Sequence, residues 1–362
     1  MTDSLPKYAV AVRSEKLADE VLSSGRNVLM CMPDEAVFYD IPSRKKIHIA
    51  EKDTDSYYDD LDIAEYVQDK GILKVYKANS IDNALVLSDK CNSSCVMCPY
   101  SDNYRKNAGK VYPEHILHLI NYIATYPEHL TITGGEPTFI GEGIFDIMEF
   151  LKEKFPKTEY LFLTNGRIFS VTDYFERMTE VLPPYICFGI PIYGDSPETH
   201  DKITRAEGSF TQAVRGMQNL MNAGIAVEIR IVVSRLNCDN LTNIARFISK
   251  YLNRAFTVNF VGLEMCGNAA KNRDKVWIDY PEMFSLMKEA VNILCRNNIK
   301  VGIYNFPLCA VDRGYWHLCK KSISDYKIVY YDECEKCEVK ELCGGFFNTT
   351  FRLSKPEVKP VI

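Results

Sequence analysis

Residues 83–98, NALVLSDKCNSSCVMC, join an apolar run typical of a buried strand to three closely spaced cysteines. Cys91, Cys95 and Cys98 fall within one eight-residue segment, so their thiolates can converge on one metal centre. A cubane [4Fe–4S] cluster normally takes four cysteines, and three ligands leave one iron open, as catalytic metal sites leave one position free. A zinc site and a chance grouping are the alternatives at this point.

This strand is the first of six that alternate with helical patterns. The strand-like runs are residues 83–89, 129–134, 159–165, 185–193, 227–235 and 256–264. The helical patterns are residues 113–125, 141–155, 171–181, 208–223, 239–252 and 280–298. Near-continuous apolar strands separated by helices predict a parallel sheet that is buried on both faces. Six βα units favour an α/β fold built on a partial (β/α)6 TIM-type barrel, with its working site at the C-terminal ends of the strands.

The sequence patterns of the two regions that flank this core differ from its regular alternation of strands and helices. Residues 1–80 carry short strand-like runs and predict a small N-terminal α+β domain, which either caps the barrel or binds a peptide by strand addition. Within it, residues 51–62 are acidic and predict a solvated loop or linker, with a binding role as the alternative. Residues 61–71 predict a short helix that ends at Gly71. Residues 301–362 are short-patterned and rich in cysteine, as in small domains that a metal stabilises. We therefore expect domains at 1–80, 81–300 and 301–362.

Composition narrows the classes of function. The 43 Lys and Arg against 48 Asp and Glu give a net charge of −5, which argues against nucleic acid as a partner. No apolar run approaches the roughly 18 to 20 residues that span a bilayer, and the first residues do not resemble a signal peptide. We therefore expect a cytoplasmic protein. An odd count of 13 cysteines then favours metal sites over a disulfide framework.

A second cysteine cluster lies beyond the predicted barrel. Cys334, Cys337 and Cys343 form a CxxCx5C pattern, and Cys309 at the end of a strand is a plausible fourth ligand. Cys319 is the alternative fourth ligand. Four thiolates suit an auxiliary [4Fe–4S] cluster, and they would also satisfy a structural zinc site.

A Gly134-Gly135-Glu136-Pro137 turn follows the second predicted strand. Two glycines let the backbone approach a ligand closely, and proline stiffens the exit from the turn. Together with the CxxxCxxC loop, this turn resembles the radical S-adenosylmethionine (SAM) superfamily over about residues 83–265. The resemblance implies that the open iron chelates the amino and carboxylate groups of SAM. One electron from the cluster then cleaves a carbon–sulfur bond, and the 5′-deoxyadenosyl radical abstracts hydrogen from a substrate.

The same resemblance implies a set of cofactor contacts. Glu136 offers a carboxylate to the ammonium group of SAM, the backbone of Met97 meets adenine, and a guanidinium suits the carboxylate of SAM. Cys266 is a candidate hydrogen donor. Two positions depart from the peptide-modifying branch, because Pro191 and Tyr193 replace a serine and an aspartate that often contact ribose. The predicted cofactor-binding residues are Met97, Gly134, Gly135, Glu136, Pro137, Asn165, Arg205 and Arg230.

Two of these positions, and the segment that follows the cysteine loop, have simpler interpretations. Arg205 could form a surface ion pair and Arg230 an inter-strand pair. Arg105, which follows the cysteine loop together with Lys106, Lys110 and Tyr112, is typical of an exposed helix start, with a peptide groove as the alternative.

The tail resembles the auxiliary-cluster (twitch or SPASM-like) domains of radical SAM enzymes. The segments 304–309, 321–327 and 334–347 are most similar to HxsC-type maturases of His-Xaa-Ser peptide systems. This implies a precursor peptide as substrate, a flavodoxin or ferredoxin as electron donor, and a second radical SAM maturase as a partner. A twitch-domain dehydrogenase or cyclase that acts on a small metabolite, and a zinc-stapled binding protein without catalysis, are the alternatives.

Overall fold

The computed structural model describes residues 7–32, 36–40, 45–49, 58–67 and 71–362. Its larger sheet has eight parallel strands in the order β14-β13-β12-β11-β10-β9-β8-β7. The strands are β7 (Ala84–Ser88), β8 (His129–Gly134), β9 (Glu159–Leu163), β10 (Ile186–Pro191), β11 (Ala226–Val232), β12 (Thr257–Val261), β13 (Val301–Tyr304) and β14 (Cys319–Lys320). Strands β7 and β14 form the two edges of this sheet and are not paired with each other, so the barrel is open and partial.

The α/β class, the parallel arrangement and the six expected strands are confirmed, but the strand count of six is too low. Val301–Tyr304 pairs in parallel with β12, and Cys319–Lys320 pairs with β13. Both strands lie in the segment that we expected to form only the C-terminal domain. The sheet therefore continues past residue 300, because a short apolar run gains backbone hydrogen bonds at an open sheet edge.

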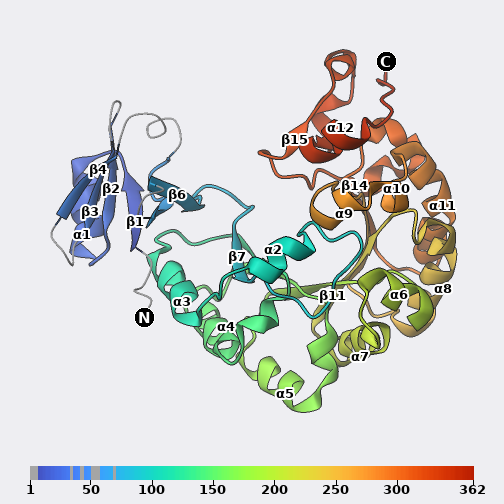
Figure 1. The fold of residues 1–362 in the computed structure, drawn as a ribbon, viewed down its shortest axis with the longest axis horizontal. Coiled ribbons are helices and arrows are strands. Elements are labelled where there is room, and N and C mark those ends of the chain that lie inside the picture. The colour runs from blue at the N-terminus through green and yellow to red at the C-terminus, as the bar shows by residue number, and fades with distance from the viewer. Residues whose placement is uncertain (1–6, 33–35, 41–44, 50–57, 68–70) are drawn as a thin grey trace.

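Helices cover the outer face of this sheet (Figure 1). All six expected helices are present, as α3 (Pro113–Tyr122), α4 (Gly143–Lys154), α5 (Thr172–Val181), α7 (Ser209–Asn222), α8 (Leu241–Tyr251) and α11 (Tyr280–Arg296). Four shorter helices lie around the loops, α2 (Asp102–Asn107), α6 (Pro197–Thr204), α9 (Gly267–Lys271) and α10 (Arg273–Val276).

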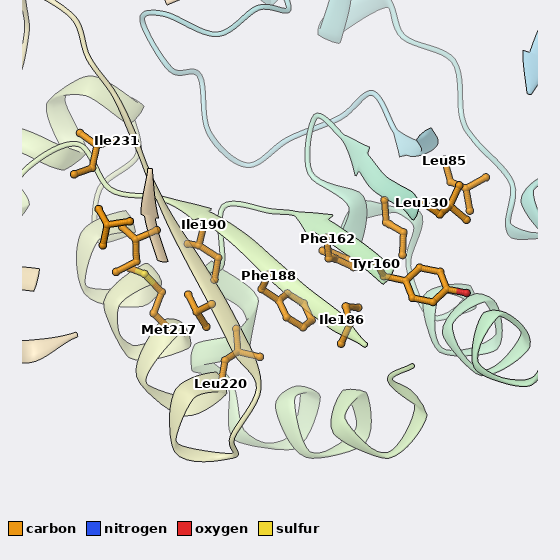
Figure 2. Packing of buried hydrophobic residues seen from close by; sticks show 14 of the residues in the cluster. Leu85, Leu130, Tyr160, Phe162, Ile186, Phe188, Ile190, Met217, Leu220 and Ile231 are labelled. Carbon is orange, nitrogen blue, oxygen red and sulfur yellow. The ribbon is translucent and has the colours of Figure 1, made fainter. Parts of the chain in front are cut away.

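Alternate residues of the strands form the core between the sheet and these helices (Figure 2). Phe188 of β10 lies opposite Phe162 of β9, with ring centroids 5.1 Å apart, and both side chains are fully buried. Met217 and Leu220 of α7 belong to the same buried cluster. Because side chains alternate along a strand, the polar residues Glu228 and Arg230 of β11 point to the concave face of the barrel.

The N-terminal region is a separate six-stranded mixed sheet in the order β4-β3-β2-β1-β5-β6. Its elements are β1 (Lys7–Val12), α1 (Glu15–Ser23), β2 (Val28–Cys31), β3 (Ala36–Asp40), β4 (Lys45–Ile49), β5 (Ile63–Val67) and β6 (Gly71–Tyr76). The helix predicted for residues 61–71 is wrong, since β5 pairs antiparallel with both β1 and β6. Ile63 and its neighbour Ala64 pack into different cores on opposite faces of the sheet, which a strand allows and a helix would not.

This sheet docks on α3 at one end of the arc of helices (Figure 1). The Tyr8 ring lies 5.3 Å from His118 and 5.8 Å from Tyr122, and Arg26 donates to the carbonyl of Asn121 at 3.1 Å. Most of the predicted acidic loop, residues 51–57, lies outside the described residues. At its end Asp59 and Asp60 are exposed, as predicted, whereas Tyr58 and Asp62 are buried.

The C-terminal region lies at the other end of the arc (Figure 1). It consists of 3-10 turns, a two-stranded antiparallel sheet of β15 (Ile328–Val329) and β16 (Phe346–Phe347), and helix α12 (Asn348–Ser354). Among the described residues, no helix combines the length and apolar character that crossing a membrane requires.

Candidate metal and cofactor site

The cysteine loop follows β7 at the C-terminal end of the barrel strands, where the sequence places it. Two short helices hold its backbone. The end of α6 accepts two hydrogen bonds from the loop. Ser94 N–H donates to the carbonyl of Thr204 at 3.0 Å, and Val96 N–H donates to that of Ile203 at 2.9 Å. From the other side, Asn268 of α9 donates its backbone N–H to the carbonyl of Cys98 at 2.9 Å and its amide to that of Cys95 at 3.2 Å.

The fold brings the three thiols of this loop close together. Burial raises the pKa of the Cys95 thiol to about 12, and the neighbouring Cys98 and Cys91 add to the rise. Burial also raises the pKa of Cys91 and of Cys98. Such sulfurs become thiolates when a metal replaces the proton, so the donor set fits an iron–sulfur cluster.

Arg105 of α2 contributes a positive charge to this loop, and sequence reasoning missed it. The side chain is buried, not part of an exposed helix start. It donates to the carbonyl of Ser93 and to the carboxylate of Asp102, both at 2.6 Å. Its charge lowers the pKa of the cysteine thiols of the loop against the larger effect of burial. A buried arginine is unusual enough to explain, but no spacing in the sequence marks it.

The two glycines of the GGEP turn allow a close approach between the turn and the cysteine loop itself. A Cβ on Gly134 would lie 2.2 Å from the carbonyl oxygen of Ser88, and one on Gly135 would lie 2.6 Å from that of Lys90. Because the side chains are absent, two backbone hydrogen bonds form here. The N–H of Gly135 donates to the carbonyl of Ser88 at 2.6 Å, and that of Glu136 donates to the carbonyl of Lys90 at 2.8 Å. The turn therefore fixes the strand end from which the cysteines start.

The Glu136 carboxylate is buried, and its partners come from within the chain. Oε1 accepts hydrogen bonds from Thr164 Oγ1 at 2.8 Å and Thr138 Oγ1 at 2.9 Å, and Oε2 accepts one from the Asn165 N–H at 2.8 Å. Burial raises the pKa of this carboxyl, while these donors lower it. The structure thus gives Glu136 a supporting role at the ends of β8 and β9. Its contact with an ammonium group stays a prediction. Pro137 begins the 3-10 turn that follows.

Asn165 and Arg205 both reach the cysteine loop. The Asn165 amide donates to Asn92 Oδ1 at 2.6 Å and lies 3.9 Å from the sulfur of Cys91. Arg205 shares a pocket of about 400 Å³ with Cys91, and its guanidinium is 3.7 Å from the Asp102 carboxylate. At 43% exposure the Arg205 side chain is largely available to a ligand.

Met97 and Arg230 have partners of their own. The Met97 side chain packs in an apolar cluster with Tyr193, Leu263 and Met265, so only its backbone is left for a cofactor. Arg230 pairs with Glu228 at 2.6 Å within strand β11, so the partner lies in the same strand and not in a neighbouring one.

Cys266 precedes α9 and faces the tail of the chain. Burial raises the pKa of its thiol to about 12, and Glu264, Lys327 and Cys98 are close enough to influence it. Lys327 comes from the C-terminal region and lies 3.2 Å from the Glu264 carboxylate. The tail and the barrel therefore meet next to the cysteine loop.

The second group of cysteines also comes together. One small pocket is lined by Cys309, Cys334, Cys337 and Cys343 with apolar neighbours. Two backbone N–H groups donate to the Cys343 sulfur, from Leu308 at 3.3 Å and from Gly345 at 3.4 Å, as is common around cluster ligands. The Cys319 thiol donates instead to the carbonyl of Tyr315 at 3.8 Å.

In the part of the chain that the structure describes, no three His, Cys, Asp or Glu side chains are gathered as ligands of one metal ion. A cubane makes a different demand, because each of its cysteines binds a separate iron. The convergence of both cysteine groups is compatible with that wider spacing.

Comparison with known proteins agrees with this geometry. Residues 85–248 match the profile of the Radical SAM superfamily. The mycofactocin maturase MftC of Mycobacterium tuberculosis is 29% identical over 167 residues, which cover 46% of this chain and 41% of that protein. The antilisterial bacteriocin subtilosin biosynthesis protein AlbA of Bacillus subtilis is 27% identical over 183 residues, which cover 48% of this chain and 38% of that protein. The chain thus matches less than half the length of these curated relatives.

A solved structure shares the fold. It is native anSMEcpe with bound AdoMet, with a TM-score of 0.50 at 15% identity over 77% of this chain and 91% of that one. Residues 85–248 are therefore similar to the radical SAM superfamily in sequence, and the fold around them is shared with a solved structure.

Proposed function

We propose that this chain is a radical SAM enzyme that modifies a ribosomally synthesised precursor peptide. A domain of this superfamily implies SAM and a [4Fe–4S] cluster, which together supply a 5′-deoxyadenosyl radical that abstracts hydrogen from the substrate. The observation that carries the proposal is the convergence of Cys91, Cys95 and Cys98 at the C-terminal end of the barrel, beside the GGEP turn.

The chain's own residues then divide the work of holding SAM. Asn165 and Arg205 present an amide and a guanidinium beside Cys91, and these groups suit the polar end of an amino acid. Glu136 orients Asn165 through its backbone N–H. The Met97 backbone and Arg230 remain candidates for adenine and for a carboxylate.

A second [4Fe–4S] cluster would be held by Cys309, Cys334, Cys337 and Cys343. Their shared pocket and the two N–H donors to Cys343 support this assignment, and they favour Cys309 over Cys319 as the fourth ligand. Residues 301–362 would then form an auxiliary-cluster domain, apart from the strands that they lend to the barrel sheet.

Aromatic and charged side chains that follow the cysteine loop or come from the tail would suit a peptide. Tyr100 stacks on Tyr104 at 5.3 Å, and Tyr326 is 80% exposed, so aromatic faces border the site together with the Glu264–Lys327 pair. Aromatic and charged groups of this kind bind extended chains well. The printed names of MftC and AlbA, a maturase and a bacteriocin biosynthesis protein, point the same way.

The remaining partners belong to the same proposal. They are a flavodoxin or ferredoxin as electron donor and a second radical SAM maturase, as in HxsC-type His-Xaa-Ser systems. The modification would be a cross-link or another bond change that begins with hydrogen abstraction. Residues 1–80 would cap the barrel or bind the peptide, and residues 81–300 would carry the catalytic site.

Metal content and SAM cleavage test the proposal. After anaerobic reconstitution we expect about eight iron per chain, four for each cubane. With SAM and dithionite we expect 5′-deoxyadenosine by mass spectrometry from the wild type and none from Cys95→Ala. Zinc without iron would overturn the proposal, as would full iron loading without 5′-deoxyadenosine in both the absence and presence of candidate peptides. Cleavage that responds only to small metabolites would favour a dehydrogenase or cyclase.

A further inference from the structure

A buried cation lies directly against the cysteine loop. Arg105 is 9% exposed, although it follows the loop on a helix of only six residues. Burying a guanidinium is costly unless it is hydrogen-bonded and paired with an anion. The hydrogen-bond partners of Arg105 must therefore offset the cost of burying its charge.

Two contacts fix the guanidinium in place. Nη1 donates to the carbonyl of Ser93, which lies between the first two cysteines, and Nη2 donates to Asp102 Oδ1, both at 2.6 Å. Asp102 is itself held by the amide of Asn268 at 2.9 Å and by the hydroxyl of Ser94 at 3.3 Å. The charge of Arg105 can therefore not turn toward solvent without breaking this network.

The positive charge of Arg105 acts on the cysteine loop as well as on its counter-ion, Asp102. Nη1 donates to the carbonyl of Ser93, so the positive charge is held against the backbone that joins Cys91 to Cys95. Asp102 is 35% exposed and is also approached by Arg205 at 3.7 Å. Solvent and the second guanidinium screen the carboxylate, whereas Arg105 remains on the buried side.

We infer that Arg105 is a positioning residue that raises the reduction potential of the cluster bound by Cys91, Cys95 and Cys98. The inference rests on the proposed function, because it requires that cluster. Reduction adds one electron from an external donor and breaks no bond, so the reduced state carries one more negative charge. A fixed positive charge nearby stabilises the reduced state relative to the oxidised one, and net charge is among the factors that set such potentials.

The test is a potentiometric titration of the reconstituted full chain with dithionite, followed by electron paramagnetic resonance. The signal that is absent in Cys95→Ala belongs to this cluster. We expect Arg105→Gln to lower the ratio of reduced to oxidised cluster about tenfold at a fixed potential, a shift of about 59 mV for one electron. Arg105→Lys keeps the positive charge, so its reduction potential should stay close to that of the wild type. Asp102→Asn removes the opposing charge and should move the potential the other way.

Arg167 provides a matched control. Its Nη1 donates to the carbonyl of Asn92 at 2.8 Å, a solvent-exposed contact, and to the Ser93 hydroxyl at 3.3 Å, a partly buried one. Arg167→Gln should therefore leave the potential near that of the wild type.

The outcomes separate this inference from the proposed function. If the wild type binds no cluster, the proposed function fails. If the wild type binds it and Arg105→Gln leaves the potential unchanged, only the role of Arg105 fails. If Arg105→Gln does not bind the cluster, the Asp102→Asn variant provides the test. A raised reduction potential in Asp102→Asn supports the inference, and an unchanged or lowered one overturns it. Equal shifts in Arg105→Lys and Arg105→Gln would show that the hydrogen bonds matter and the charge does not.

Discussion

The carboxylate of Glu136 accepts a hydrogen bond from the hydroxyl of Thr164 at 2.8 Å, which ties the GGEP turn after β8 to the end of β9. The same carboxylate accepts the N–H of Asn165, the residue whose amide reaches Cys91. The acidic residue of the motif thus joins the ends of two strands, β8 and β9. Through Asn165, Glu136 would also act indirectly on a cofactor.

Replacing Glu136 by Gln should destabilise the apo-protein by about 2 kcal/mol. One acceptor oxygen becomes an NH2 group that faces N–H or O–H donors, so hydrogen bonds to a charged group are lost in a site that excludes water. Urea unfolding of the apo-protein measures the effect. Glu142→Gln is the control, because Glu142 is 77% exposed and its pairing with Arg177 should contribute less than about 1 kcal/mol. Equal unfolding midpoints for the two variants would contradict the supporting role of Glu136.

The Gly135→Ala variant tests the contact between the turn and the cysteine loop. The added Cβ would lie 2.6 Å from the Lys90 carbonyl oxygen and 2.8 Å from that of Asp89, and backbone atoms cannot move aside cheaply. We expect the first cluster to be lost, with about four iron per chain remaining, and a destabilisation of about 1 to 3 kcal/mol. Iron analysis and urea unfolding measure the two effects.

Gly109→Ala is the matched control for that change. A Cβ at Gly109 meets no atom within 4 Å, so iron loading and stability should match the wild type. Normal iron loading in Gly135→Ala would show that the loop tolerates a displaced turn.

The barrel could be predicted from the sequence because its strands and helices are long and regularly patterned. Residues 61–71 could not, since a short run such as Ile63–Val67 suits a strand or a helix until its neighbours are known. Strand β14 has two residues and leaves no pattern at all; only its pairing with β13 defines it. Sequence patterns thus predicted the elements that carry their own periodicity and missed those that depend on a partner.

The candidate site divides in the same way. The position of Cys91 after a strand is visible in the sequence, because a strand end and a cysteine spacing are both local. The burial of Arg105 is not local, since its carboxylate partner Asp102 is fixed by Asn268, 166 residues further along the chain. The partners of Glu136 likewise come from the end of another strand. Motif residues could therefore be located from the sequence, but their roles needed the tertiary contacts.

Cysteine substitutions in the tail should identify the fourth ligand of the proposed second cluster. Cys309→Ala should lower the iron content from about eight to about four per chain, because its sulfur lines the pocket that the other three cysteines share. Cys319→Ala should leave about eight, since its thiol bonds to the carbonyl of Tyr315. Iron analysis with a parallel zinc determination measures both variants. The reverse pattern would assign Cys319 as the ligand, and zinc in place of the missing iron would assign a zinc site.

His200 should make the apo-protein sensitive to mild acid. Its side chain is buried, and Nδ1 accepts the N–H of Tyr193 at 3.2 Å, so the fold requires a neutral ring. Burial lowers the pKa of His200 from 6.5 to about 4. Between these values the unfolded chain binds a proton that the folded chain excludes, so stability is complete above pH 6.5 and falls as the pH drops toward 4. The loss amounts to about 3 kcal/mol over this window.

The His200→Asn variant isolates this contribution. The asparagine Oδ1 can accept the Tyr193 N–H in place of Nδ1, but it does not titrate, so the unfolding midpoint should change less between pH 6.5 and 4 than in the wild type. His129→Asn, at a position where the side chain is 45% exposed, should keep the wild-type profile. Urea unfolding at half-unit steps of pH compares the three proteins. A profile for His200→Asn as steep as that of the wild type would assign the acid sensitivity to other groups, because removing the buried imidazole must remove its share of the proton uptake on unfolding.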